Sequence, residues 1–249
     1  WNQLIKLVAK HKSFSDVAWA MKHEQVDKLS IIANRLAPDN PQLLYQKFFT
    51  EREFDLYDGK GDYDVQNKKI NELRERAVRE IVEIDGVNSI LEFTLNVESP
   101  WRVGIAFGEV AEPGVDREML PELLESEEKA LMQFAGGFIW GRFQKHGWEW
   151  VDRTDTTDWN PSKIGRFLSY LPFVVETWGR VSRLLEGDES PYWLKTNVNP
   201  YIIEAKEHID YAVEHLLTHG RPRAAIDCLA YTLHKEQYLN RELAVKVLI

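Results

Sequence analysis

Apolar residues recur at intervals of three and four positions along most of the chain, which is the spacing of an amphipathic helix. Proline, glycine and small polar residues separate these stretches, as they do at helix ends. The alternation of a strand extends at most over residues 148–151, too short to build a sheet. The predicted helices cover residues 16–36, 42–53, 65–85, 87–96, 101–111, 121–144, 162–171, 173–186, 202–218, 223–234 and 241–249, with a short helix near Trp193.

Two helix starts follow from a small polar residue placed directly before a proline. Ser99 precedes Pro100, and Asn160 precedes Pro161. The side chain of Ser99 is expected to accept a hydrogen bond from an N–H of the first turn, while proline has no N–H to satisfy. Both pairs therefore predict the first residues of a helix.

Glycines are expected to shape the chain in two ways. Gly86 follows a periodic stretch, where a helix can end in the left-handed conformation that glycine adopts without strain. The pair Gly136 and Gly137 lies inside a periodic stretch, where it allows either close packing of a second helix or a kink. Glycine at these positions thus indicates one helix end and one candidate crossing point.

The range 65–85 is expected to form a helix with one apolar face and one charged face. Ile70, Ala77 and Ile81 fall on one apolar stripe, together with other aliphatic residues. Arg74 is counted with the lysines, arginines and glutamates that fill the opposite, solvated face. The range is therefore expected to pack through its aliphatic stripe alone.

The pattern predicts an all-α protein and leaves two packings open, an irregular closed helical bundle and an α-solenoid of stacked antiparallel helix pairs. The solenoid is favoured because the helix–loop–helix unit recurs at about 35 to 45 residues, as in helical-repeat proteins. Small residues such as Ala224 and Ala225 also stand where helices would cross. Residues 1–249 are accordingly interpreted as a single helical-repeat domain, and as a fragment of a longer chain.

Composition and charge exclude several classes of protein. The chain has 249 residues with 44% hydrophobic and 29% charged residues, which is typical of a globular domain. Its 31 Lys and Arg residues against 40 Asp and Glu residues give a net charge of −9, which disfavours nucleic-acid binding. The single Cys228 suits a reducing compartment, and no run is long and apolar enough to span a membrane. A cytoplasmic location is expected.

Several segments of the later part of the chain carry a resemblance to known repeats. They are the run LSYLPF at 168–173, Glu176 to Trp178, Tyr192 and Trp193, and LLTHGRPRAA at 216–225. Together with the segments at 100–104 and 138–150, this part resembles the degenerate HEAT-like or tetratricopeptide-like repeats of large uncharacterised bacterial proteins. The resemblance covers about residues 85–249 and carries no catalytic motif. It implies a scaffold segment of a multidomain protein.

Histidines are the first candidate for metal chemistry. His215 and His219 lie four residues apart on one predicted helix, and His208 lies seven residues before His215. Imidazoles at this spacing can share a metal ion. The alternative is that His219 only interacts favourably with the negative end of the helix dipole. No cofactor is expected, and these histidines are kept as candidates.

Tryptophans form the clearest compositional anomaly and supply the candidate binding residues. Trp148, Trp150 and Trp159 could stack on a ligand or anchor a partner, although most such aromatic residues belong to a core. Trp148 and Trp150 are placed in an irregular, extended link. Arg221 is the fourth candidate binding residue, although its place between Gly220 and a proline has a structural explanation.

Two acidic segments have both a functional and a structural interpretation. The range 109–128 holds eight acidic residues and one arginine, and it either docks a basic partner or forms a solvated linker with a helix start. The loop 55–64 holds four aspartates and two glycines, which suits calcium, but it does not follow the twelve-residue calcium-loop pattern. A solvated loop is the expected alternative.

Two hypotheses for function remain. The first is a non-catalytic helical-repeat scaffold that mediates protein–protein interaction within a larger bacterial protein, with an unknown protein partner. The second is a HEAT-like hydrolase such as a DNA base glycosylase, with Asp152, Asp155 and Asp158 beside the tryptophans as candidates. The second lacks the basic surface that phosphate binding needs. Whether the chain is an enzyme stays open, with the non-catalytic interpretation favoured.

Overall fold

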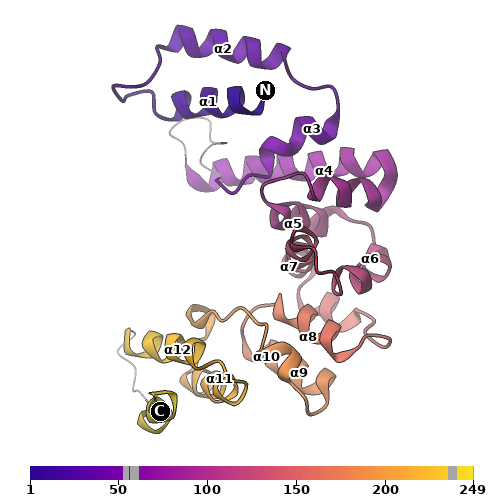
Figure 1. Ribbon diagram of the computed structural model, residues 1–249, viewed down its shortest axis with the longest axis vertical. Helices are drawn as coiled ribbons and strands as arrows, with labels where there is room; N and C mark the ends of the chain where they lie inside the picture. Colours follow the sequence, from indigo (N-terminus) through magenta and orange to yellow (C-terminus); the bar gives the residue numbers. More distant parts are fainter. Residues whose placement is uncertain (53–55, 57–61, 235–239, 249) are drawn as a thin grey trace. The chain divides into compact units, whose positions relative to one another are not determined.

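The computed structural model describes all residues except 53–55, 57–61, 235–239 and 249. Every regular element among the described residues is a helix, so the predicted all-α class is confirmed (Figure 1). No helix in the described ranges is long and apolar enough to cross a membrane. The residues form two compact units, one of residues 1–115 and 126–146 and the other of residues 116–125 and 147–249. The single helical-repeat domain stays a prediction.

The helices of unit 1 are, in chain order, α1 (Asn2–Ser13), α2 (His23–Arg35), α3 (Pro41–Tyr45), η1 (Gln46–Phe48), α4 (Tyr63–Thr94), α5 (Pro100–Val110) and the first part of α7 (Lys129–Arg153). Unit 2 holds nearly all of α6 (Val115–Leu123), the end of α7, α8 (Pro161–Ser169), α9 (Val175–Leu185), α10 (Ser190–Trp193), η3 (Pro200–Ile202), α11 (Lys206–Thr218), α12 (Pro222–His234) and α13 (Arg241–Leu248). Several helices pack against their neighbour in the chain, as α1 does with α2, α4 with α5 and α11 with α12, whereas α10 packs against α8.

Helix α4 breaks at the predicted glycine. Gly86 has a φ of 58°, in the left-handed region, and the helix resumes directly after it. The hydroxyl of Ser89 donates to the carbonyl oxygens of Ile81 at 2.6 Å and Gly86 at 2.8 Å. Carbonyls freed by the break thereby keep a partner, because a serine from the second segment replaces the lost backbone donors.

Glycines allow α5 and α7 to touch through their backbones. Gly104 and Gly108 on α5 face Gly137 and Gly141 on α7, and each pair is spaced by four residues. A Cβ atom added at Gly104 would lie 2.1 Å from the carbonyl oxygen of Phe134, and one added at Gly137 would lie 2.0 Å from that of Trp101. No side chain larger than hydrogen fits there. Of the two roles expected for the pair at 136–137, close packing is the one observed.

A buried arginine of α7 holds the end of α5. Arg142 donates from Nη1 to the carbonyl oxygen of Ala111 at 2.7 Å and from Nη2 to that of Glu112 at 2.9 Å. The last carbonyls of a helix have no partner within the helix, and Arg142 satisfies two carbonyls just beyond α5. At the other end, α5 begins at Pro100 as predicted, but the side chain of Ser99 forms no cap hydrogen bond.

Aromatic side chains fill the core of each unit. In unit 1, Phe107 stacks on Phe134 with ring centroids 6.1 Å apart, beside the glycine crossing. In unit 2, the fully buried rings of Trp178 and Trp193 lie 5.9 Å apart, and Phe173 meets Trp178 edge to face at 5.1 Å. Burying rings of this size supplies most of the stabilisation available to a helical unit.

The first predicted helix, 16–36, was placed too early. The structure has a helix over Asn2–Ser13, which the sequence analysis did not predict, and the next helix begins only at His23. The segment between them turns back, because the backbone N–H of Met21 donates to His11 Nδ1 at 3.1 Å and Trp19 packs edge to face on His11. These contacts with α1 replace the helical hydrogen bonds that residues 16–22 would otherwise form.

The predicted helix 121–144 is also wrong at its start. Pro121 lies inside α6, which ends at Leu123, and α7 begins at Lys129. Proline removes only its own hydrogen bond, and the N–H of Leu124 still reaches the carbonyl of Leu120 at 2.9 Å. The helix α7 then continues beyond 144 through a break at Gly147 to Arg153. Residues 148–151 are therefore helical, and the extended link predicted there is wrong.

The glycine crossing predicts a strong effect of one methyl group. Gly137→Ala is expected to lower the free energy of unfolding by at least about 2 kcal/mol, because its Cβ would overlap a backbone oxygen that cannot move without separating the helices. Gly179→Ala is the matched control, since Gly179 lies in α9 with open space around it, and alanine there should raise the free energy by about 0.5–1 kcal/mol. Chemical denaturation measures both; equal effects of the two substitutions would contradict the close crossing.

Candidate functional site

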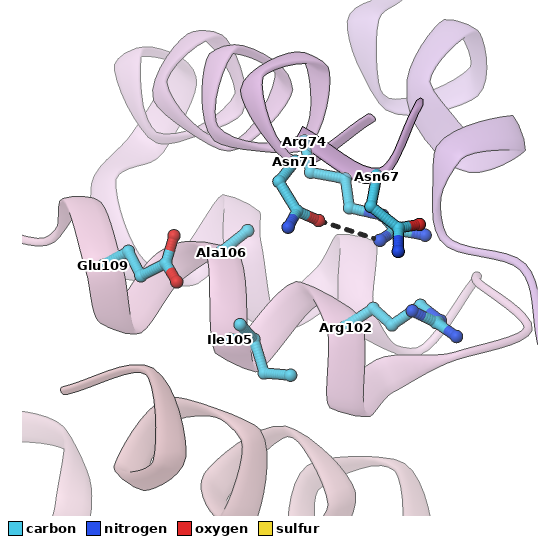
Figure 2. Close-up of a pocket in the computed structure, with 7 residues that line it drawn as sticks. All are labelled: Asn67, Asn71, Arg74, Arg102, Ile105, Ala106 and Glu109. Atoms are coloured by element: carbon cyan, nitrogen blue, oxygen red, sulfur yellow. Dashed lines mark hydrogen bonds between the residues drawn. The ribbon is translucent and has the colours of Figure 1, made fainter. Parts of the chain in front are cut away.

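A polar cavity of about 190 Å³ lies between α4 and α5 in unit 1. Its lining residues come from both helices and include two arginines, two asparagines and a glutamate, over a floor of two apolar residues (Figure 2). They are Asn67, Asn71, Arg74, Arg102, Ile105, Ala106 and Glu109. A second hollow of about 430 Å³ shares Asn67, Asn71 and Glu109 and is otherwise lined by Asp64, Lys68, Glu72 and Glu75. The two hollows share three lining residues, two of them on α4, and together they are called the groove.

Helical spacing explains why these residues share a groove. Asn67, Asn71 and Arg74 follow one another at four- and three-residue steps on α4, so they project from one face of the helix. Arg102 and Glu109 stand seven residues apart on α5. Seven residues correspond to about 10 Å along a helix axis, so the cationic and anionic ends of the cavity are separated by two turns of α5.

Arg74 is the most constrained residue of the cavity. It is only 4% exposed, and its Nε donates to the carbonyl oxygen of Phe48 at 2.8 Å. Its Nη1 donates to Asn71 Oδ1 at 3.2 Å, the bond drawn in Figure 2. Because a buried guanidinium requires hydrogen bonds, these contacts both compensate its burial and fix the plane of its head group.

The assignment of Arg74 to the solvated face of its helix was wrong. Arg74 lies four residues after Ile70 and four before Val78, and both of these residues are buried. The position therefore belongs to the buried stripe, and an arginine on such a stripe was the signal available in the sequence. Ile84, assigned to the apolar stripe, is instead exposed.

The acidic end of the cavity contains a partly buried carboxyl group. Burial raises the pKa of Glu109, and the neighbouring negative charge of Glu75 raises it further, while Lys145 acts in the opposite direction. Lys145 also donates from Nζ to the backbone oxygen of Glu109. Glu109 belongs to the acidic range 109–128, so at its first residue this range faces a cavity rather than forming a solvated linker.

The three tryptophan candidates belong to unit 2, and none of them is among the residues that line this cavity. Trp150 donates from Nε1 to Asp116 Oδ2 at 2.7 Å, and the rings of Trp150 and Trp159 pack on Phe167 with centroid distances of 5.7 and 5.5 Å. The guanidinium of Arg180 lies 4.3 Å from the ring centre of Trp148. All three rings are half-buried and in contact with protein groups, and their role in binding stays a prediction.

The aspartates beside these tryptophans are engaged in structural contacts. Asp152 pairs with Arg180 at 2.6 Å and with Arg183 at 3.0 Å, and the hydrogen bond from Arg180 is the main cause that lowers its pKa. Asp155 accepts the hydroxyl of Thr157 at 2.8 Å. A carboxylate stabilised in its ionised form by two arginines is a weak base, so Asp152 does not suit proton abstraction.

His215 and His219 lie in an aromatic cluster of unit 2. The ring of His215 stacks on Trp193 with a centroid distance of 4.7 Å, and its Nδ1 lies 3.4 Å from Glu189 Oε2. His219 Nδ1 lies 2.6 Å from the backbone oxygen of His215. Within the described ranges, no group of three or more His, Cys, Asp or Glu side chains is placed to hold a metal ion.

Arg221 and Cys228 contact other parts of the protein, and most of the predicted calcium loop lies outside the described residues. Arg221 donates from Nη1 to the carbonyl oxygens of Trp193 at 2.9 Å and Thr196 at 2.8 Å, which fixes the segment after α10. Cys228 is buried, and burial raises the pKa of its thiol to about 12. In the predicted calcium loop 55–64, residues 55 and 57–61 lie outside the described residues.

Comparisons of the chain with protein-family models, with curated proteins and with solved structures gave no match.

Burial of His215 predicts a pH-dependent stability. Desolvation is the main cause that lowers its pKa from 6.5, with Glu189 acting in the opposite direction, so the unfolded chain takes up a proton more readily than the folded one. The free energy of unfolding should therefore fall as the pH decreases from about 8 through 6.5. His215→Phe keeps a stacking ring and should flatten this slope, whereas His146→Phe, at an exposed position, should leave it as in the wild type. Denaturation curves at several pH values test this, and an unchanged slope in His215→Phe would contradict it.

For the carboxyl group of Glu109, the predicted dependence of the free energy of unfolding on pH has the opposite sign. Its pKa is raised above 4.5, so its ionised form is disfavoured in the folded chain at neutral pH. Glu109→Gln should raise the free energy of unfolding at about pH 7.5, and the gain should vanish as the pH falls through the raised pKa, where the wild type is itself protonated. Glu83→Gln, at an exposed position of α4, serves as control and should change little. A gain that persists at low pH would show that charge is not its cause.

Proposed function

We propose that this chain is a non-catalytic helical module that binds a protein partner through the groove between α4 and α5. The observation that carries the proposal is the groove itself, in which a cavity lined by Arg74 and Arg102 opens into a wider hollow with acidic walls. A groove with charged groups of both signs along its length suits recognition of side chains on another protein surface.

The lining of the groove supports recognition of polar groups. Five of the seven residues that line the cavity, and all seven that line the adjoining hollow, carry charged or carboxamide side chains. Pockets that enclose small molecules and cofactors are mostly apolar with a few polar groups. The polar lining suits contact with charged side chains of a partner protein.

The surroundings of Cys228 and Asp152 support the same proposal. Cys228 has a raised pKa and carries a thiol rather than a thiolate at neutral pH. Asp152 is held in its ionised form by two arginines. These groups serve the fold of unit 2, and the hydrolase alternative gains no support from them.

The wider arrangement is part of the proposal. Pairs such as α4 with α5 and α11 with α12 are the building blocks that a HEAT-like or tetratricopeptide-like solenoid would stack. We propose such a stack as the scaffold that presents the groove, and a larger bacterial protein as its context, on the strength of the repeat pattern and the resemblance in sequence.

A bulky substitution in the groove tests the proposal. Asn67 lines both hollows, so Asn67→Trp should fill the groove and reduce capture of the partner at least tenfold. Asn88→Trp introduces the same side chain at an exposed position of the same helix, outside the groove, and should capture the partner as the wild type does. The measurement is quantitative affinity capture from cells of the source organism with the full chain as bait, followed by cross-linking of the captured protein.

Two outcomes would contradict the proposal. Capture that is equally strong with Asn67→Trp and Asn88→Trp would show that the partner binds elsewhere. Turnover of a substrate by the purified chain would show that the module is not a binding module alone.

A further inference from the structure

We propose that the cavity between α4 and α5 binds a single carboxylate, the Asp or Glu side chain of the protein partner, through the guanidinium groups of Arg74 and Arg102. This inference rests on the proposed function and names the group that the groove recognises. Its basis is the placement of two guanidiniums at one end of a small cavity whose other end is acidic.

The two arginines form the cationic end. Figure 2 shows the side chains of Arg74, Arg102 and Asn67 extending toward the same end of the cavity. Arg74 is fixed by Phe48 and Asn71, so it offers a preorganised head group, while Arg102 is half-buried on the facing helix. A planar guanidinium matches the two oxygens of a carboxylate, which makes arginine the preferred residue for this ligand.

The remaining lining suits the rest of an acidic side chain. Ile105 and Ala106 form an apolar floor between the two charged ends, where the methylene groups of a glutamate can lie. Asn67 and Asn71 add neutral carboxamides that donate and accept hydrogen bonds. With a volume of about 190 Å³, the cavity has room for the end of one side chain.

The acidic end selects for one negative charge. Glu109 stands two helical turns from Arg102, and Asp64, Glu72 and Glu75 line the adjoining hollow against the single cation Lys68. Like charges repel across such distances when water is partly excluded. A doubly charged phosphate or a free dicarboxylate would meet about twice the repulsion that the single carboxylate of a side chain meets. The open hollow along α4 then accommodates the chain that carries that side chain.

The experiment uses defined probes and the full chain. Nuclear magnetic resonance follows the Nε–H signals of Arg74 and Arg102 during titration with N-acetyl-glutamate N-methylamide, with its glutamine counterpart, with succinate and with inorganic phosphate. We expect saturable shifts of both signals with the glutamate compound and none with the glutamine compound. Succinate and phosphate should bind at least about tenfold more weakly than the glutamate compound.

Matched variants assign the effect to the cavity. Arg102→Gln should weaken binding of the glutamate compound at least about tenfold, because it removes the charge-assisted hydrogen bonds, and Arg102→Lys should restore part of it through charge alone. Arg79→Gln removes the same charge from an exposed position of α4 outside the groove and should bind as the wild type does. The amide spectrum of each variant shows whether its fold is retained.

Each contrary result has a defined meaning. Equal shifts with the glutamate and glutamine compounds, no shift at all, or tighter binding of phosphate or succinate would overturn the carboxylate inference. If Arg102→Gln captures the partner like the wild type while Asn67→Trp does not, the inference fails and the proposed function stands. If Asn67→Trp also captures the partner, the proposed function itself fails.

Discussion

The contact on which unit 1 depends is the backbone-to-backbone crossing of α5 and α7. Four glycines remove the side chains that would separate the helices, and added Cβ atoms would lie 2.0–2.4 Å from backbone oxygens of the facing helix. Interiors packed this closely transmit small displacements instead of absorbing them. One face of α5 is fixed against α7, and Arg142 holds its C-terminal end. Another face carries Arg102 and Glu109, so the position of α5 fixes where these two side chains lie relative to α4. The geometry of the groove therefore originates in glycines that do not line it.

The buried charge of Arg74 in the groove is compensated by hydrogen bonds. A guanidinium as buried as that of Arg74 would be costly without partners, and Phe48 and Asn71 supply them from a neighbouring turn and from its own helix. At the other end, burial and then the negative charge of Glu75 raise the pKa of Glu109. The ionised form of Glu109 is therefore less favourable in the folded chain than in water.

Much of the fold could be predicted from local sequence, and the groove could not. Helical spacing and the left-handed position of Gly86 are local properties, and Asn160 caps α8 by accepting the N–H of Lys163 at 2.9 Å. The early start given to α2 failed because contacts of Trp19 and Met21 with α1 override helical propensity. Arg74 is predicted on the solvated face because it is charged, whereas its spacing of four residues from Ile70 and Val78 puts it on the buried face. A cavity depends on the spacing of two helices, which no local pattern contains.

The two units differ in what surrounds the charged and polar side chains discussed above, and this difference bears on the proposed function. In unit 2 the groups that the sequence singles out satisfy one another: Asp152 pairs with Arg180, and Arg221 holds backbone carbonyls. Such contacts stabilise a fold, because a ligand that bound Asp152 or Arg221 would have to displace the protein groups that these side chains already contact. In unit 1, Arg102 and Glu109 line the cavity between α4 and α5, so under the proposed function a ligand would contact them without separating α5 from α7. A ligand binds more readily to side chains that it can reach without breaking contacts within the protein. The proposed function therefore uses the side chains that line the cavity.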